Sequence, residues 1–274
     1  MIIRMKYKKE FLGKSLGTFI LALFGCGSVA TSVLFDAYHG IIQIALAWGV
    51  GVTLAIYLTR HLSCAHLNPA VTVAMVASRR MRPAKMTVYL LGQLFGAISG
   101  GIAIYLLFGS SIASFEHQHG IIRGTANSIA TARMFGEFYT TPGSAAVVSM
   151  PQAMAAEAFG TFLLLLMIFA LTEGCNVGRP DDALAPLFIG LTVSSIICLI
   201  APLTQAGLNP ARDFGPRLIA WAAGWKDAAF PDNKGGFFFV YILAPLIGGV
   251  ISSLFFVHIL EPSMKTQSDS CNCN

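Results

Sequence analysis

The sequence has few charged residues: Asp, Glu, Lys and Arg make up 11% of its 274 residues, whereas hydrophobic residues make up 55%. Soluble domains carry roughly 25% charged residues. Together with a mean hydropathy of +0.69, this composition excludes an ordinary soluble protein and predicts a polytopic membrane protein. The sequence also lacks a hydrophilic stretch long enough for a separate soluble domain, so we expect residues 1–274 to form a single membrane domain.

The sequence also lacks the motifs of common enzymes. It contains no nucleotide-binding motif and no catalytic-triad pattern, so we predict no catalytic residue and no cofactor. Its six cysteines lie mostly in apolar or terminal segments and do not predict a disulfide framework. His117 with His119, and Cys271 with Cys273, are short pairs without a third ligand, so we predict no metal site.

Long apolar runs dominate the rest of the chain. A transmembrane helix needs about 20 apolar residues. Segments that meet this condition lie at approximately 12–35, 41–58, 84–108, 152–171, 183–200 and 237–259. The sequence therefore predicts an all-α membrane protein with six transmembrane helices.

The basic residues predict how this protein is oriented. With six spans, 12 of the 18 Lys and Arg residues lie on the side that holds both termini, and 6 lie on the other side. Cytoplasmic loops carry an excess of Lys and Arg. We therefore expect both termini in the cytoplasm and the protein in the plasma membrane. The net charge of +5 is interpreted as a topology signal rather than as nucleic-acid binding.

The tripeptide Asn-Pro-Ala occurs twice, at 68–70 and 209–211, between apolar segments. Proline is tolerated in the first turn of a helix, and Asn is among the best N-cap residues. We expect two short helices that begin at these motifs and end near Ser78 and Trp221, too short to span. Irregular backbone at membrane depth survives only against protein or a water-filled cavity, so the duplicated motif predicts a pore.

The two halves of the chain repeat. Residues 14–19 resemble residues 157–162 at an offset of 143, and Asn68 and Asn209 are 141 residues apart. Three spans per half is an odd number, which predicts an inverted repeat with its polar site near the membrane midplane. The expected halves are approximately 11–108 and 152–260. An outer loop at 109–151 joins them, and a cytoplasmic tail follows at 261–274.

Facing half-helices would place two helix N-termini at the centre of the membrane. Each N-terminus carries roughly half a positive charge, so the pair would oppose the passage of cations. The side-chain amides of Asn68 and Asn209 could donate to a passing solute. The segments before the two Asn residues are expected to offer backbone carbonyls as acceptors, from Cys64, Ala65, His66, Gln205, Ala206 and Gly207.

Two charged residues in these apolar surroundings need a partner. Arg212 follows the second motif directly and would donate to solutes and repel cations; the alternative is that it snorkels to a lipid headgroup. Glu157 lies inside the fourth span, where a charge facing lipid is costly. We expect it to accept hydrogen bonds from backbone N–H groups near a short helix, with a proton relay as the alternative.

These motifs, together with residues 55–59, 65–72 and 208–216, resemble the major intrinsic proteins, and most closely the glycerol-facilitator (aquaglyceroporin) branch. The resemblance covers roughly residues 11–260. It implies an aquaporin-like fold with six transmembrane helices plus two half-membrane re-entrant helices. It also implies a homotetramer with one pore in each protomer. Asp213 and the long loop after the third span favour the glycerol branch, and we expect Asp213 to support the structure.

The resemblance further implies a four-residue constriction on the outer side, at Trp48, Ile197, Ala206 and Arg212. Glycerol facilitators usually carry Gly at the second position and an aromatic residue at the third. This sequence therefore keeps one ring at Trp48, adds bulk at Ile197 and opens the side of Ala206. From periodicity alone, Trp48 could equally be an interfacial anchor.

A second departure from the family pattern is Lys14, which stands where the first half usually has a Glu that matches Glu157. Glu10 lies one turn earlier and could substitute for it, or the register could slip by four residues.

We expect a passive channel for small uncharged solutes, glycerol and related polyols first, with water as co-permeant. Three alternatives remain open. The first is a channel of the same fold for another small neutral solute or a weak acid. The second is a coupled secondary transporter, which would need an ion-binding group at the midplane. The third is a membrane scaffold with a closed pore.

Overall fold

The computed structural model describes residues 7–139, 146–231 and 235–268, and all regular structure in these ranges is helical. Six helices are long and apolar enough to cross a membrane. They are Lys8–Phe35 (α2), Ile41–Thr59 (α3), Pro83–Gln118 (a short turn followed by α5, Met86–Gln118), Met150–Thr172 (α7), Ala185–Thr204 (α8) and Phe237–Met264 (which includes α10, Ala244–Phe255). The predicted fold class is confirmed.

Two short helices begin at the duplicated motif. They are α4 (Pro69–Ala77), with 9 residues, and α9 (Pro210–Ala220), with 11 residues. At about 1.5 Å per residue they reach roughly half of the ~30 Å apolar core of a bilayer. Each has proline in its first turn, and Ser78 and Trp221 are the residues at which they end. We call α4 and α9 the half-helices.

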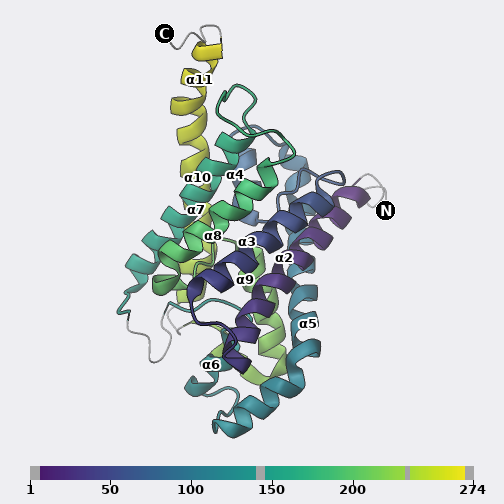
Figure 1. Cartoon of the computed structure of the whole chain (residues 1–274), viewed down its shortest axis with the longest axis vertical. Coiled ribbons are helices and arrows are strands. Elements are labelled where there is room, and N and C mark those ends of the chain that lie inside the picture. Colours follow the sequence, from purple (N-terminus) through teal and green to yellow (C-terminus); the bar gives the residue numbers. More distant parts are fainter. Residues whose placement is uncertain (1–6, 140–145, 232–234, 269–274) are drawn as a thin grey trace.

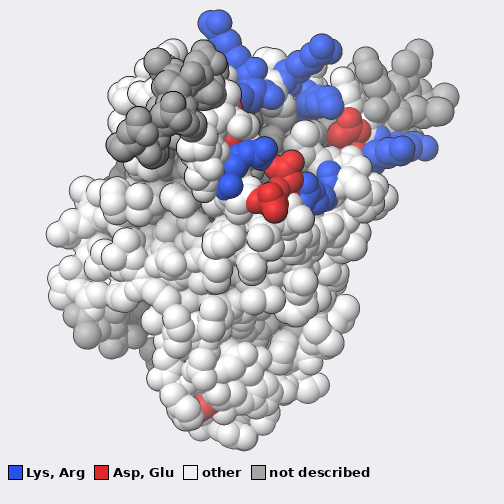
Figure 2. Space-filling view, turned by 45° about the horizontal axis from the view of Figure 1, so that its top comes forward, with Lys and Arg blue, Asp and Glu red and all other residues white. Residues whose placement is uncertain are grey.

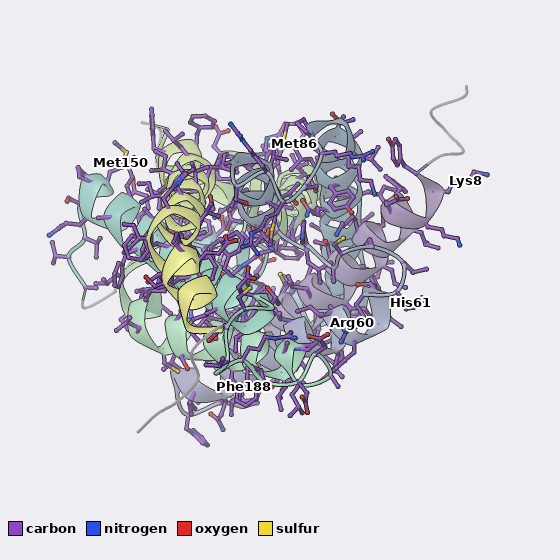
Figure 3. The ribbon with its side chains drawn as sticks, turned by 90° about the horizontal axis from the view of Figure 1, so that it is seen from above. Lys8, Arg60, His61, Met86, Met150 and Phe188 are labelled. Carbon is purple, nitrogen blue, oxygen red and sulfur yellow. The ribbon has the colours of Figure 1, made fainter. Side chains whose placement is uncertain are left out.

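The two halves of the chain lie on opposite sides of the molecule but exchange their half-helices. Seen from above in Figure 3, Lys8 of α2 and Met150 of α7 stand at opposite edges. The half-helix α4 packs mainly against α10 of the second half, whereas α9 packs against α5 of the first half. Contact with α10 is close: a Cβ atom added to Gly249 would lie 3.2 Å from the carbonyl oxygen of Ala70.

Glycines let the long helices touch at equivalent places in the two halves. A Cβ atom on Gly96 of α5 would lie 2.2 Å from the carbonyl oxygen of Ser15 in α2. A Cβ atom on Gly248 of α10 would lie 2.0 Å from the carbonyl oxygen of Ala158 in α7. Neither distance is possible for real atoms, so these backbones approach only because the side chain is a hydrogen atom.

The third span is longer than predicted. The apolar pattern ends near residue 108, whereas α5 continues to Gln118, so the first part of the expected outer loop 109–151 is helical. The extension stays helical because its polar groups have partners. Glu116, near its end, accepts a hydrogen bond of 2.8 Å from Nε of Arg123 in the following loop. A hydropathy criterion locates only the apolar part of a helix, whereas backbone hydrogen bonding can continue the helix into polar residues.

The chain ends of the described structure lie towards one end of the bundle. The expected tail 261–274 begins as a helix, α11 (Glu261–Ser268), which projects upwards in Figure 1. Figure 2 shows Lys and Arg side chains gathered over this end of the molecule. The paired cysteines of the tail, Cys271 and Cys273, lie outside the described residues.

The α7–α10 contact yields a prediction about stability. Replacing Gly248→Ala forces a methyl group into the backbone of α7, and overpacking of this kind costs at least about 1–3 kcal/mol. We expect a lower Tm and a lower yield of folded protein in detergent.

The control is Gly109→Ala, because a Cβ atom on Gly109, which lies in α5, meets nothing within 4 Å. Equal Tm values for the two variants would contradict the assigned contact.

Candidate functional site

A cavity of about 460 Å³ lies between the two halves. Its wall includes Arg60, which is labelled in the view from above in Figure 3. It also includes Asp182, whose carbonyl accepts a 2.8 Å hydrogen bond from Arg60 Nη1. Further along α3 and α8 the same wall includes Trp48 and Ile197, and Arg212 of α9 joins them. Ala206 lines the cavity too, so all four residues of the expected constriction line one cavity.

Most of the predicted pore residues line this cavity. They are Cys64, Ala65, His66, Asn68, Ala206, Gly207 and Asn209. Gln205, Glu157 and Asp213 are not part of the wall and hold its elements from behind. The sequence analysis missed the apolar side of the wall, which includes Leu21, Val52, Val71, Leu164, Ile189 and Val193. A signal was present, because Ile189, Val193 and Ile197 follow one another at a spacing of four residues along α8.

The two Asn residues cap their own half-helices and also tie the two loops together. Asn68 Oδ1 accepts a hydrogen bond of 2.8 Å from Ala70 N, and Asn209 Oδ1 accepts one of 3.1 Å from Ala211 N. The amide nitrogens cross over, since Asn68 Nδ2 donates to the carbonyl of Leu208 and Asn209 Nδ2 donates to that of Leu67, both at 2.8 Å. Each side-chain amide has two hydrogens, so one hydrogen per Asn stays available to a solute.

The loops that precede the half-helices have strained backbones. Ala65, Gln205, Ala206 and Leu208 have φ values of 43°, 63°, 62° and 55°. Such left-handed conformations are uncommon outside glycine, and they redirect successive carbonyl groups. The strain is maintained by the surrounding contacts.

Glu157 fastens the second loop. Its Oε1 accepts a hydrogen bond of 2.8 Å from Gly207 N, and its Oε2 accepts one of 2.7 Å from Leu208 N. Because both oxygens are engaged with backbone, the carboxylate serves to hold the loop in place. This arrangement gives no support to the alternative of a proton relay.

The expected line of free carbonyl acceptors is only partly present. The carbonyl of His66 accepts a 2.6 Å hydrogen bond from Gln93 Nε2 and so points towards α5. The carbonyl of Ala206 accepts a 2.9 Å hydrogen bond from Arg212, and that of Gly207 accepts one of 2.6 Å from Asn209 N. These carbonyls first organise the loops, and a second lone pair on each is what remains for a solute.

Arg212 is enclosed by protein and does not reach a headgroup. It is 3% exposed, and its guanidinium carbon lies 4.0 Å from the centre of the Trp48 ring. Its Nη1 donates to Glu137 Oε1, and its Nη2 donates to the Ala206 carbonyl. Trp48 is itself buried and lines the cavity, so it does not act as an anchor at a membrane interface.

Glu137 is the functional residue that the sequence analysis missed. It lies in the outer loop, next to a short helix α6 (Ile129–Ala132), and nothing in its sequence context marks it. Its backbone N–H donates to Asp213 Oδ1 at 2.7 Å, and its carbonyl accepts from Arg217. The segment containing Glu137 is therefore fixed across the constriction, so that its carboxylate meets Arg212.

Asp213 organises this loop through a second ion pair. Arg217 lies one turn later in α9, and its Nε donates to Asp213 Oδ2 at 2.8 Å. Gln205 adds a further tie, since its Oε1 accepts a 2.7 Å hydrogen bond from Phe138 N. The charges around Arg212 thus occur as two buried ion pairs, Arg212 with Glu137 and Arg217 with Asp213.

Among the described residues of the first half, no carboxylate takes the place that Glu157 has in the second half. Lys14 is fully buried at the matching position. Glu10 does not take over this place, because it pairs with Lys85 at 3.3 Å near the end of the helix. A slip in register is also excluded. Gly17 packs on Leu67 in the first half as Gly160 packs on Leu208 in the second half.

The bonds of Glu157 predict the effect of removing its charge. In Glu157→Gln one backbone N–H loses its acceptor, and an unpaired buried donor costs about 1–3 kcal/mol. We expect the free energy of unfolding to fall by this amount, seen as a lower Tm in thermal unfolding in detergent. The exposed Asp181→Asn is the control, and a variant at Glu157 as stable as this control would contradict the assigned bonds.

Comparisons with known proteins agree with this geometry. A family model described as major intrinsic protein matches residues 1–256. A propanediol uptake facilitator from Citrobacter freundii is 37% identical over 258 residues, which are 94% of this chain and 94% of the relative. A glycerol uptake facilitator from Escherichia coli is 39% identical over 247 residues, 90% of this chain and 85% of the relative. The X-ray structure of the aquaglyceroporin from Plasmodium falciparum matches with a TM-score of 0.81 and 27% identity, covering 95% of this chain and 100% of that one. The chain belongs to the major intrinsic protein family.

Proposed function

We propose that this chain is a passive membrane channel for small uncharged solutes, glycerol and related polyols first, with water as co-permeant. The observation that carries the proposal is the shared cavity in which Arg212, Trp48 and the two motif asparagines meet. Relatives named as glycerol uptake facilitators support glycerol as the solute. The protein is a channel and not an enzyme.

Selectivity in this proposal comes from the two faces of the constriction. Arg212 has five N–H donors and uses two of them on Glu137 and the Ala206 carbonyl, so others remain for solute hydroxyl groups. Trp48 and Ile197 form the apolar face that meets the carbon skeleton. A polyol has hydroxyl groups for the first face and C–H groups for the second.

Ion exclusion follows from charge and desolvation. The N-termini of α4 and α9 meet at the crossed Asn hydrogen bonds, and each carries roughly half a positive charge. A cation would lose water in this cavity and meet positive potential at the N-termini of the half-helices. The nearby carboxylates of Glu137 and Glu157 are both engaged and would not compensate it. This arrangement excludes cations and protons by the same field.

Propanediol is a second candidate solute. A relative named as a propanediol uptake facilitator is 37% identical over 94% of this chain. The specific feature in its favour is Ile197, which adds an apolar branch to the cavity wall and suits a solute with a methyl group in place of one hydroxyl group. A coupled transporter is less well supported, since the carboxylates near the midplane already have partners.

The chain is a multi-pass membrane protein, and three finer features belong to this proposal. Residues 1–274 would form one channel domain, with both termini in the cytoplasm of a cell whose plasma membrane it spans. The concentration of Lys and Arg at one end of the molecule supports this orientation. Four protomers would assemble into a homotetramer, each protomer with its own pore.

The channel proposal predicts the kinetics of transport. In proteoliposomes, water, urea, glycerol and propanediol should cause rapid swelling, and larger polyols should cause slower swelling. The rate should rise in proportion to the solute gradient and need no ion gradient. Flux that saturates at low concentration and requires a proton or sodium gradient would identify a coupled transporter, and absence of any swelling would identify a closed scaffold.

The assigned constriction predicts a change in solute preference. The double substitution Ile197→Gly with Ala206→Phe moves bulk to the loop side and adds a second ring beside Arg212. We expect the ratio of glycerol to water permeability to change roughly tenfold.

The matched control is Leu199→Ala, which lies on the outer face of α8 and is 58% exposed. If the double variant is folded and keeps the solute ranking of the wild type, the assignment of these positions is wrong.

A further inference from the structure

The two re-entrant loops pack against their long helices in the same way. A Cβ atom on Gly160 of α7 would lie 2.8 Å from Leu208 Cδ2. A Cβ atom on Gly17 of α2 would lie 2.4 Å from Leu67 Cδ2. In each half a glycine thus receives the leucine that precedes the motif asparagine. This shared contact aligns α2 with α7 independently of any sequence comparison.

The residue three positions before this glycine differs between the halves: it is Glu157 in α7 and Lys14 in α2. In the second half, the carboxylate accepts hydrogen bonds from two consecutive backbone N–H groups of the loop. The matching groups in the first half are the N–H groups of His66 and Leu67, and they have no acceptor among the described residues. Protonated Lys14 cannot accept these hydrogen bonds, because an ammonium group has three donors and no acceptor.

The ammonium group of Lys14 itself has no hydrogen-bond partner in the described chain. It is 0% exposed, and Nζ lies 3.9 Å from the centre of the Tyr89 ring. A ring face offers partial compensation, but a buried charge without a counterion is strongly unfavourable. Glu10 makes no hydrogen bond to Lys14 Nζ, and its Oε1 accepts one of 3.3 Å from Lys85 Nζ instead.

Several buried polar side-chain atoms near Lys14 and the first re-entrant loop have no hydrogen-bond partner among the described residues. The hydroxyl groups of Thr18 and Ser63 are buried without a partner and can turn to donate. Ser63 lies against the turn of α2 that precedes Lys14, since a Cβ atom on Gly13 would be 2.8 Å from Ser63 Oγ. Gln93 Oε1 is an unpartnered acceptor in this region, and it carries no charge.

We propose that a small monovalent anion of the chloride class binds between Lys14 and the first re-entrant loop. It would accept hydrogen bonds from the N–H groups of His66 and Leu67 and neutralise the ammonium group. In this way Lys14 and a bound ion together do for the first loop what Glu157 does for the second. A water molecule could accept the same hydrogen bonds, but it would leave the charge of Lys14 uncompensated.

The direct test uses bromide as the probe. Crystals of the full-length protein grown in sodium bromide should give an anomalous difference peak within hydrogen-bonding distance of Lys14 Nζ and of the two backbone nitrogens. A peak that refines as water, with no anomalous signal, would overturn the proposal. This readout uses no flux and so does not depend on the channel proposal.

A second test compares sodium chloride with sodium gluconate at equal ionic strength. The Tm of the wild type should rise saturably with chloride by roughly 2–4 °C, because the ion binds only the folded state. Lys14→Glu supplies the carboxylate covalently and should lose the chloride effect without losing stability in gluconate. Lys14→Gln should also lose the effect.

The control is Lys226→Gln, an exposed residue after α9, which should keep the chloride effect. A wild type indifferent to chloride, or a chloride effect that persists in Lys14→Glu, would overturn the proposal.

Discussion

The crossed hydrogen bonds between the two re-entrant loops are the constraint on which the rest of the site depends. Asn68 donates to the carbonyl before Asn209, and Asn209 donates to the carbonyl before Asn68. At membrane depth lipid cannot replace a lost backbone partner, so each bond is expensive to leave unmade. One side chain therefore caps a helix, joins the two halves and still offers a donor to the cavity.

The constriction depends on a different device, the pairing of buried charges. Arg212 is tolerated at the cavity wall because Glu137 and the Trp48 ring meet it on the protein side. Glu137 is in turn held by Asp213 and Arg217 of the second half-helix. The outer loop therefore determines how the guanidinium is aimed. In the proposed channel, selectivity would be shared between a half-helix and a loop that is remote in sequence.

Much of this organisation was predictable from the sequence, and the reasons are physical. The apolar spans, and the two helix starts at Asn68 and Asn209, follow from hydropathy and capping chemistry, which are local. The full length of α5 was missed because its final turns are polar and are stabilised by Glu116 pairing with Arg123. Glu137 was missed because its role comes only from tertiary contacts. The buried Lys14 was noticed as a departure, but only the structure reveals its lack of a partner.

The exchange of half-helices has a consequence for the order in which the chain is assembled. The half-helix α4 is synthesised early. The helix that covers it, α10, is synthesised only near the end of the chain. Until then the polar start of α4 lacks its permanent surroundings. The packing around α4 is therefore completed last, and until then this early segment lacks part of its contacts within the membrane. Long-range contacts of this kind slow folding and favour transient intermediates. For a channel built from interlocked halves, we therefore expect membrane insertion and folding to be the slowest steps of its biogenesis.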